Sequence, residues 1–310
     1  MVDLSVDLGF IRLSNPIFTA SGTCGYGLEM IPFLELKKLG GVVVKGLYFE
    51  PRQGNPPPRL VETTAGLLNA IGLPGIGVEA FAREVLPRLH QQQATVIVNV
   101  CGNTDDEYER VVRYLDDHPG IAFYELNISC PNVKEGGQCP ALDARATFRI
   151  VSRVKKATQR PIMTKLSPNV TDITIIARAA EEAGSDALSL VNTFLGLAVD
   201  VETGQPKLAN VWGGLSGPAI KPLALRMVYQ VVQTVKVPVV GIGGIVTGYD
   251  VLEFLAVGAK AVEVGTANFA NPRVTLQIID ELQNFCQKKQ LSRIEDYIGS
   301  FRPRREKQET

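Results

Sequence analysis

Short apolar runs alternate with segments of helical periodicity along the whole chain. The helical segments repeat apolar positions every three to four residues, whereas the apolar runs are strand-sized and rich in β-branched residues. We expect strands at residues 17–20, 41–45, 95–100, 122–127, 161–165, 186–191, 237–242 and 261–264. We expect helices at residues 28–39, 78–90, 105–117, 144–157, 172–183, 222–235, 249–257 and 274–288.

This alternation predicts an α/β fold in which each of eight strands is followed by a helix, the pattern of a (β/α)8 TIM barrel. Most of the strands are almost wholly apolar, as is typical of parallel strands that are buried on both faces. A doubly wound open sheet would give the same periodicity. We expect a single barrel domain over residues 1–310, in which the charged residues 301–310 form a frayed tail.

Two of the connections that follow strands are unusually long. Residues 46–77 and 192–221 separate a predicted strand from its helix. Long ordered loops are usually functional, and the loops at the carboxyl end of barrel strands carry the active site. We therefore expect these two loops to cover that end of the barrel.

Charge and terminal sequence narrow the class of protein. The 310 residues include 32 basic and 32 acidic side chains, so the formal net charge is +0. Without a basic stripe, nucleic acid is not expected as a partner. The first residues have neither a basic region nor an apolar run, so secretion is not expected, and no apolar run is long enough to span a bilayer. We expect a cytoplasmic protein with no membrane partner.

Cysteine and histidine usage limits the chemistry. None of the five cysteines belongs to a Cys-x-x-Cys pair, so we expect no bound metal and no iron–sulfur cluster within this chain. The two histidines, His90 and His118, lie near the ends of predicted helices. The reactive groups that remain are cysteine, lysine and amide side chains.

One cysteine stands at the end of a predicted strand. Cys130 lies in the sequence Asn-Ile-Ser-Cys-Pro-Asn at residues 127–132, between the strand at 122–127 and a loop that contains Gly136 and Gly137. Barrel enzymes keep their catalytic groups at such positions, and a thiol ionises near neutral pH. Cys130 is a candidate base or nucleophile. The alternative is a small buried apolar residue, as most unpaired cysteines are.

Glycine-rich sequences end the last two predicted strands. Gly243 and Gly244 follow one of them, and Gly265 and Thr266 follow the other. In barrels, such strand ends present backbone amides to a phosphate group. Glycine can also serve tight turns alone. The sequence predicts a phosphorylated ligand, but neither a Gly-x-Gly-x-x-Gly motif nor a P-loop indicates a nicotinamide dinucleotide or ATP.

Lysines and amides gather at the same strand ends. Lys45 and Lys165 each end an apolar strand, and buried lysine requires a partner. That partner could be a reduced flavin, an orotate-like carboxylate or a protein carboxylate, and a Schiff-base lysine is a further possibility. Amides suit a flat heterocycle with carbonyl and N–H groups, although each could cap a turn. The polar side chains in question are Asn69, Asn99, Asn127, Asn192 and Thr193.

Taken together, the motifs resemble the class 1 dihydroorotate dehydrogenases, and most closely the catalytic subunit of class 1B. The resemblance extends over essentially the whole chain, and several motifs carry it. They lie at residues 15–16, 51–56, 69–73, 127–133, 191–194, 213–218 and 241–244.

The resemblance implies a flavoprotein with one FMN per chain, which oxidises dihydroorotate to orotate in pyrimidine biosynthesis with Cys130 as general base. The implied FMN ligands are Ser21, Lys45, Gly46, Asn99, Asn127, Lys165, Val191, Gly217, Gly243, Gly244, Gly265 and Thr266. The implied ligands of the pyrimidine are Lys45, Asn69, Ala70, Ile71, Gly72, Leu73, Asn127, Asn192 and Thr193. The loop at residues 133–140 would close over the site and exclude water.

One residue differs from the family's usual sequence, and one further cysteine has no role that the resemblance implies. Gly46 stands where the family usually carries serine or threonine, and Cys139 is a second thiol close to Cys130 with no assigned role. By resemblance, a partner subunit carrying FAD and a [2Fe–2S] cluster would pass electrons to NAD⁺, within a heterotetramer built on a homodimer of this chain. Three alternatives stay open: a fumarate-dependent class 1A enzyme, a dihydropyrimidine dehydrogenase-like enzyme, and a flavin-free phosphate-binding barrel.

Overall fold

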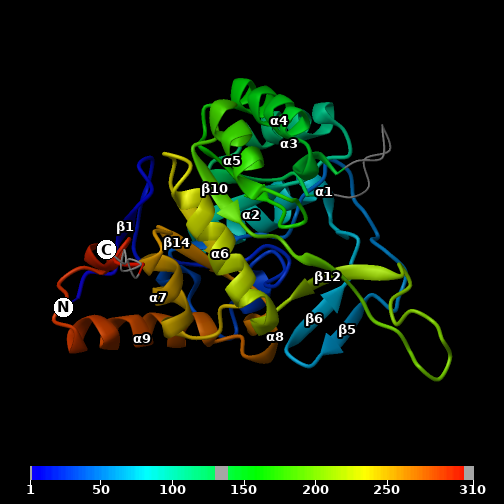
Figure 1. Ribbon diagram of the computed structural model, residues 1–310. Helices are drawn as coiled ribbons and strands as arrows, with labels where there is room; N and C mark the ends of the chain where they lie inside the picture. The colour runs from blue at the N-terminus through cyan, green and yellow to red at the C-terminus, as the bar shows by residue number, and fades with distance from the viewer. Residues whose placement is uncertain (1, 130–138, 304–310) are drawn as a thin grey trace, which may run out of the picture.

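Eight parallel strands close into a barrel in the computed structural model of the chain, which describes residues 2–129 and 139–303 (Figure 1). The hydrogen-bonded strand order is β10-β13-β14-β3-β4-β7-β8-β9, and the circle closes where β9 pairs with β10. This closure confirms the predicted barrel and excludes the open sheet. The strands are β3 (Ile17–Thr19), β4 (Gly41–Val43), β7 (Val96–Val100), β8 (Ile121–Asn127), β9 (Ile162–Leu166), β10 (Ala187–Leu190), β13 (Val239–Ile242) and β14 (Ala261–Val264).

Amphipathic helices surround the barrel and pack their apolar faces on it. Several begin where a side-chain oxygen accepts a hydrogen bond from the first turn, as Thr104, Asp143 and Thr247 do. The helices are α1 (Gly77–Ala80), α2 (Leu86–Gln91), α3 (Asp105–Asp116), α4 (Ala144–Ala157), α5 (Ile173–Glu182), α6 (Lys221–Val232), α7 (Gly248–Ala256), α8 (Ala267–Ala270) and α9 (Val274–Lys288). A π-helical segment, η3 (Phe81–Val85), joins α1 to α2, so the helix expected at 78–90 is present with an irregular middle.

The helix expected at residues 28–39 is absent. Two 3-10 turns stand in its place, η1 (Leu28–Met30) and η2 (Leu36–Lys38). Pro32 lies between them and has no backbone N–H to donate, so it interrupts the hydrogen-bond ladder that an α-helix would need. The remaining 3-10 turns are η4 (Pro140–Leu142), η5 (Pro218–Ile220) and η6 (Ile294–Tyr297).

The two long loops build a second, antiparallel sheet that the sequence did not predict. Its strands are β5 (Leu60–Thr63), β6 (Gly66–Asn69), β11 (Phe194–Leu197) and β12 (Trp212–Ser216), in the order β11-β12-β6-β5. Figure 1 shows this sheet to one side of the barrel, at the lower right. Because β6 pairs with β12, residues 46–77 and 192–221 form one unit rather than two independent covers.

The first described residues pair with residues 292–294, on the side of the molecule opposite the antiparallel sheet (Figure 1). The amide of Asp3 donates to the carbonyl of Ser292, and the amide of Ile294 donates to the carbonyl of Asp3. A short ribbon of β1 (Val6–Asp7) and β2 (Arg12–Leu13) follows. Residues 304–310, which make up most of the predicted tail, lie outside the described residues. No helix within residues 2–129 and 139–303 has the length and apolar character needed to cross a membrane.

Candidate active site

The predicted site residues that the structure describes gather at one end of the barrel, because parallel strands bring their carboxyl ends to the same rim. Ser21 follows β3, Lys45 and Gly46 follow β4, Asn99 and Asn127 lie in β7 and β8, Lys165 lies in β9, Val191 to Thr193 follow β10, Gly243 and Gly244 follow β13, and Gly265 and Thr266 follow β14. Gly217 and residues 69–73 come from the antiparallel sheet, where a Cβ on Gly217 would lie 3.6 Å from Thr266 Cγ2 and Leu73 Cδ2 lies 3.6 Å from the Cβ position of Gly46. The rim position that the sequence predicted for these groups is therefore the one observed.

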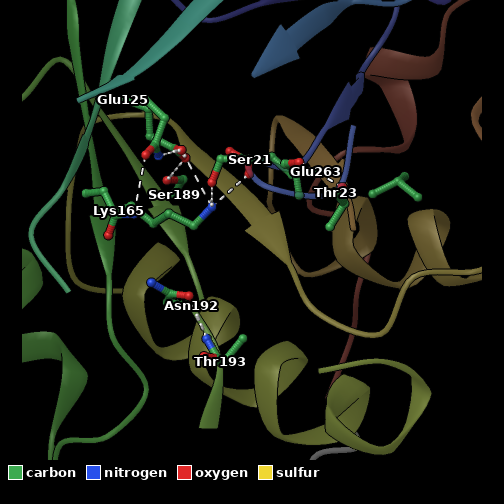
Figure 2. A network of polar contacts seen from close by, with 12 residues as sticks. Ser21, Thr23, Glu125, Lys165, Ser189, Asn192, Thr193 and Glu263 are labelled. Carbon is green, nitrogen blue, oxygen red and sulfur yellow. Dashed lines mark hydrogen bonds and ion pairs between the residues drawn. The ribbon is translucent and has the colours of Figure 1, made fainter. Parts of the chain in front are cut away.

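Lys165 lies between two buried carboxyl groups. Its Nζ is 3.1 Å from Oε2 of Glu263 and 3.5 Å from Oε2 of Glu125, and it donates to Ser21 Oγ at 3.4 Å. Figure 2 shows the ammonium group reaching into this network from β9. Of the partners that the sequence left open for Lys165, protein carboxylates are present.

Glu125 organises the two neighbouring amides. Its Oε1 accepts from Ser189 Oγ at 2.7 Å, and its Oε2 accepts from Asn99 Nδ2 at 2.5 Å. Asn99 Oδ1 in turn accepts from Asn127 Nδ2 at 3.3 Å. This chain of hydrogen bonds fixes which way the amides of both asparagines point. Glu125 is thus a residue of the candidate site that the sequence analysis missed.

The pKa values of Lys165 and Lys45 shift in opposite directions. Burial disfavours the charged form of Lys165, but Glu125 and Glu263 outweigh that penalty and raise its pKa above the ordinary value. Burial lowers the pKa of Lys45, and the charge of Arg59 lowers it further, while Glu29 opposes them. Lys165 is therefore held as a structural cation, whereas the charge of Lys45 would be stabilised by an anionic ligand.

The unusual glycine at position 46 has a steric explanation. A Cβ atom on Gly46 would lie 2.7 Å from Cys101 Sγ and 3.0 Å from Asn99 Oδ1. Cys101 is fully buried, and its Sγ donates to Asn99 Oδ1 at 3.5 Å. The thiol of Cys101 thus occupies the room that a serine or threonine side chain at position 46 would need.

We expect Gly46→Ala to destabilise the protein by about 1–3 kcal/mol, the usual cost of overpacking a filled interior. Cys101→Ala in the same chain should restore most of that loss, because it removes the atom that the new Cβ would strike. Chemical unfolding of the two single variants and the double variant measures this coupling. If the two losses simply add, the steric account is wrong.

Glycines form the narrow turns expected at a phosphate site. Gly243 and Gly244 have positive φ angles of 131° and 71°, which side chains rarely adopt. A Cβ on Gly244 would lie 2.7 Å from Lys221 Cβ and 3.0 Å from the carbonyl oxygen of Gly217. The ends of β13 and β12 therefore approach each other by bare backbone. Thr266 Oγ1 donates to Ser216 Oγ at 2.8 Å and ties the end of β14 to the same place.

The charge of Lys221, which lies beside these glycines, is already balanced. Its Nζ is 2.6 Å from Asp250 Oδ1 and 2.7 Å from Glu253 Oε2. An anion at the glycine turns would therefore meet mainly backbone groups, which is the kind of phosphate site that the sequence predicted.

The segment predicted to hold a heterocycle is tied to the antiparallel sheet. Asn69 Nδ2 donates to the carbonyl of Gly214 at 3.0 Å, and Asn55 Nδ2 donates to the carbonyl of Ala70 at 2.9 Å. Leu73 packs against Tyr48 and Cys101.

Asn169, which the sequence analysis did not assign to the site, positions the other half of that predicted pocket. Its Nδ2 donates to the carbonyl of Thr193 at 3.0 Å, and its Oδ1 accepts from the amide of Leu195 at 2.9 Å. The amide of Thr193 also donates to the side chain of Asn192 at 2.8 Å, as Figure 2 shows.

Cys130 and residues 133–138 of the predicted covering loop lie outside the described residues. The chain on either side of them meets at Ile128, just beyond β8. The amide of Ala141 donates to the carbonyl of Ile128 at 3.1 Å, and Cys139 Sγ donates to the same carbonyl at 3.6 Å. Cys139 thus helps to hold the segment that follows residues 130–138 against the barrel.

Comparison with known proteins gives one consistent result. The family model described as dihydroorotate dehydrogenase matches residues 3–286. The chain is 50% identical over 299 residues to a protein from Geotalea uraniireducens named dihydroorotate dehydrogenase B (NAD(+)), catalytic subunit. That alignment covers 96% of this chain and 98% of the other. A protein of the same name from Maridesulfovibrio salexigens is 49% identical over 302 residues, with 97% and 99% covered.

Structural comparison supports the same fold. A crystal structure of DHODH from Eimeria tenella in complex with ferulenol superposes with a TM-score of 0.80, at 23% sequence identity, over 96% of this chain and 88% of that one. At that identity, the likeness concerns the barrel and its arrangement.

Proposed function

This chain belongs to the dihydroorotate dehydrogenase family, and from that premise we propose that it oxidises (S)-dihydroorotate to orotate in the de novo synthesis of pyrimidine nucleotides. The observation that carries this proposal is the match, at about half identity and nearly full length, to relatives named as the catalytic subunit of dihydroorotate dehydrogenase B (NAD(+)). These names also favour the NAD-linked class 1B enzyme over class 1A.

The residues at the rim fit FMN. Gly217, Gly243 and Gly244 carry no side chain that would cover the backbone amides of these turns, so those amides could bind a phosphate group. Lys165 brings a fixed positive charge to the same end of the barrel. Further residues of the rim would hold the cofactor together with these groups: Ser21, Lys45, Gly46, Asn99, Asn127, Val191, Gly265 and Thr266. Bound FMN supplies the hydride acceptor for the reaction.

The chain's own groups would hold the substrate and move its proton. Lys45 offers a positive charge to the carboxylate of dihydroorotate, and Asn69, Asn127 and Asn192 offer amides to its carbonyl and N–H groups. Residues 70–73 and Thr193 complete this pocket. Cys130 would remove the proton from C5, and residues 133–140 would exclude water while it does so.

We propose that electrons leave through a partner subunit that carries FAD and a [2Fe–2S] cluster, and that NAD⁺ receives them. The word subunit in the relatives' names supports such a partner. A homodimer of this chain would form the core of the assembly, in the cytoplasm. Large exposed apolar side chains on the antiparallel sheet support a protein contact there, since Leu195, Leu197 and Trp212 are 67%, 59% and 63% exposed.

Anaerobic addition of dihydroorotate to the purified, yellow protein tests the proposal. We expect the flavin absorbance to bleach, because the reductive half-reaction needs only this chain. A colourless protein that does not take up FMN would overturn the proposal, and faster bleaching by dihydrouracil would indicate a dihydropyrimidine dehydrogenase-like enzyme. Turnover with fumarate by the chain alone would identify class 1A, whereas NAD⁺ reduction should require the partner subunit.

A further inference from the structure

Two acids and one base share a buried part of the barrel interior. Glu125 and Glu263 are 0% exposed, and Lys165 is 4% exposed. If all three were ionised, the group would carry one uncompensated negative charge. A buried carboxylate without a partner of its own is costly enough that it takes up a proton instead. The charge balance of this network therefore requires one of the two glutamates to be neutral.

The hydrogen bonds decide which glutamate is ionised. Both oxygens of Glu125 accept hydrogen bonds, from Ser189 Oγ and Asn99 Nδ2, and donors of this kind stabilise a carboxylate. Glu263 Oε2 faces Lys165 at 3.1 Å, but its Oε1 is buried and has no hydrogen-bond partner among the described residues. Although Lys165 lies closer to Glu263, Glu125 is the better site for the negative charge.

Within the described residues, the strands that pair with β14 bring no further charge to Glu263. The strands on either side of β14 are β13 and β3, and neither carries an ionisable side chain. Burial and the charge of Glu125 raise the pKa of Glu263 well above its ordinary value, against the pull of Lys165. Burial also opposes ionisation of Glu125, but Lys165 and the hydrogen bonds from Glu263, Ser189 and Asn99 outweigh it and lower its pKa.

We propose that Glu263 is a positioning residue that stays protonated at neutral pH. It donates a hydrogen bond to Glu125 through Oε2, the oxygen that faces the network, and it contacts Lys165 without adding a second negative charge beside the ammonium group. Together the three side chains then carry no net charge. In the enzyme proposed above, the reduced cofactor would meet a lysine balanced by one carboxylate rather than two. Ionising Glu263 would add a negative charge at this end of the barrel and disfavour flavin reduction. Only this last consequence rests on the proposed function.

Infrared spectroscopy of the flavin-free protein tests the proton directly. Wild type should show the C=O stretch of a protonated carboxyl group at neutral pH, with a shift in heavy water, and Glu263→Gln should lose that band. Glu62→Gln, which changes an exposed glutamate of β5, is the matched control and should keep it. The absence of such a band from wild type would overturn the proposal.

The pH dependence of stability gives a second readout without flavin. An acid whose pKa is higher in the folded than in the unfolded state makes the folded protein bind more protons. The stability of the folded protein then falls as pH rises above the pKa of glutamate in the unfolded chain, about 4.3, and stops falling once pH exceeds the pKa in the folded protein. Glu263→Gln removes this loss, so its unfolding temperature should exceed that of wild type at neutral pH, by a margin that grows upward from about pH 5. A lower unfolding temperature than wild type across this range would overturn the proposal.

The flavin potential connects the network to the cofactor. Glu263→Gln should keep the wild-type midpoint potential of bound FMN at neutral pH, because one neutral group replaces another. Glu125→Gln should shift it, because that change removes the ionised partner. Equal shifts in both variants would overturn the assignment of the proton to Glu263. Because the infrared and stability tests use flavin-free protein, failure of the proposed function would leave them intact.

Discussion

Cys130→Ser is expected to slow the oxidation of dihydroorotate by about 10²- to 10⁴-fold while FMN stays bound, because a positioned general base contributes that much. A thiol has an ordinary pKa of about 8.5 and can take up and release a proton near neutral pH. A serine hydroxyl is much harder to deprotonate. Stopped-flow measurement of flavin reduction at neutral pH, under anaerobic conditions, isolates this step from reoxidation.

The matched control is Cys139→Ser, which changes the other thiol close in sequence. Cys139 Sγ faces the carbonyl of Ile128, so this variant should reduce its flavin at nearly the wild-type rate. In wild type, the rate of flavin reduction should rise between about pH 6 and pH 9 as the thiol ionises. Near-normal flavin reduction by Cys130→Ser, or a flat pH profile, would remove Cys130 from the role of base.

The barrel could be predicted because strands that are buried on both faces consist almost wholly of apolar residues. Every residue of β13 and β14 is buried, and such strands give short apolar runs that stand out between amphipathic helices. The antiparallel sheet gives no such signal. Its strands are only partly buried, and Gly66, Gly196 and Gly213 interrupt the alternation that marks a half-buried strand.

The rim of the site could be predicted for the same reason, since a residue that ends a parallel strand lies at the active end of a barrel. The contacts between buried side chains beneath the rim could not be predicted from the sequence. Glu125 and Glu263 carry the same sequence signal as Lys165, a charge within an apolar strand, but their meeting depends on how strands far apart in sequence are placed around the barrel. The close approach of Gly46 to Cys101 likewise depends on the pairing of Leu47 with Val100.

Lys165→Met is expected to cost about 3–5 kcal/mol of folding free energy, because it leaves the carboxylate of Glu125 buried without its cation. Methionine preserves much of the apolar length of the side chain, so the loss reports the charge rather than a cavity. The same change should lower the amount of FMN that remains with the purified protein, because a positive charge at the cofactor site is gone. Chemical unfolding and the flavin content of the purified protein measure the two effects separately.

The double variant Lys165→Met/Glu125→Gln separates the structural role of Lys165 from its role toward the cofactor. Removing both charges eliminates the unpaired carboxylate, and replacing a whole buried ion pair by neutral groups is often nearly neutral for stability. We therefore expect the double variant to recover most of its folding free energy but not its flavin. Recovery of both would show that Lys165 serves FMN only through the fold. Wild-type stability and flavin content in Lys165→Met alone would contradict both roles.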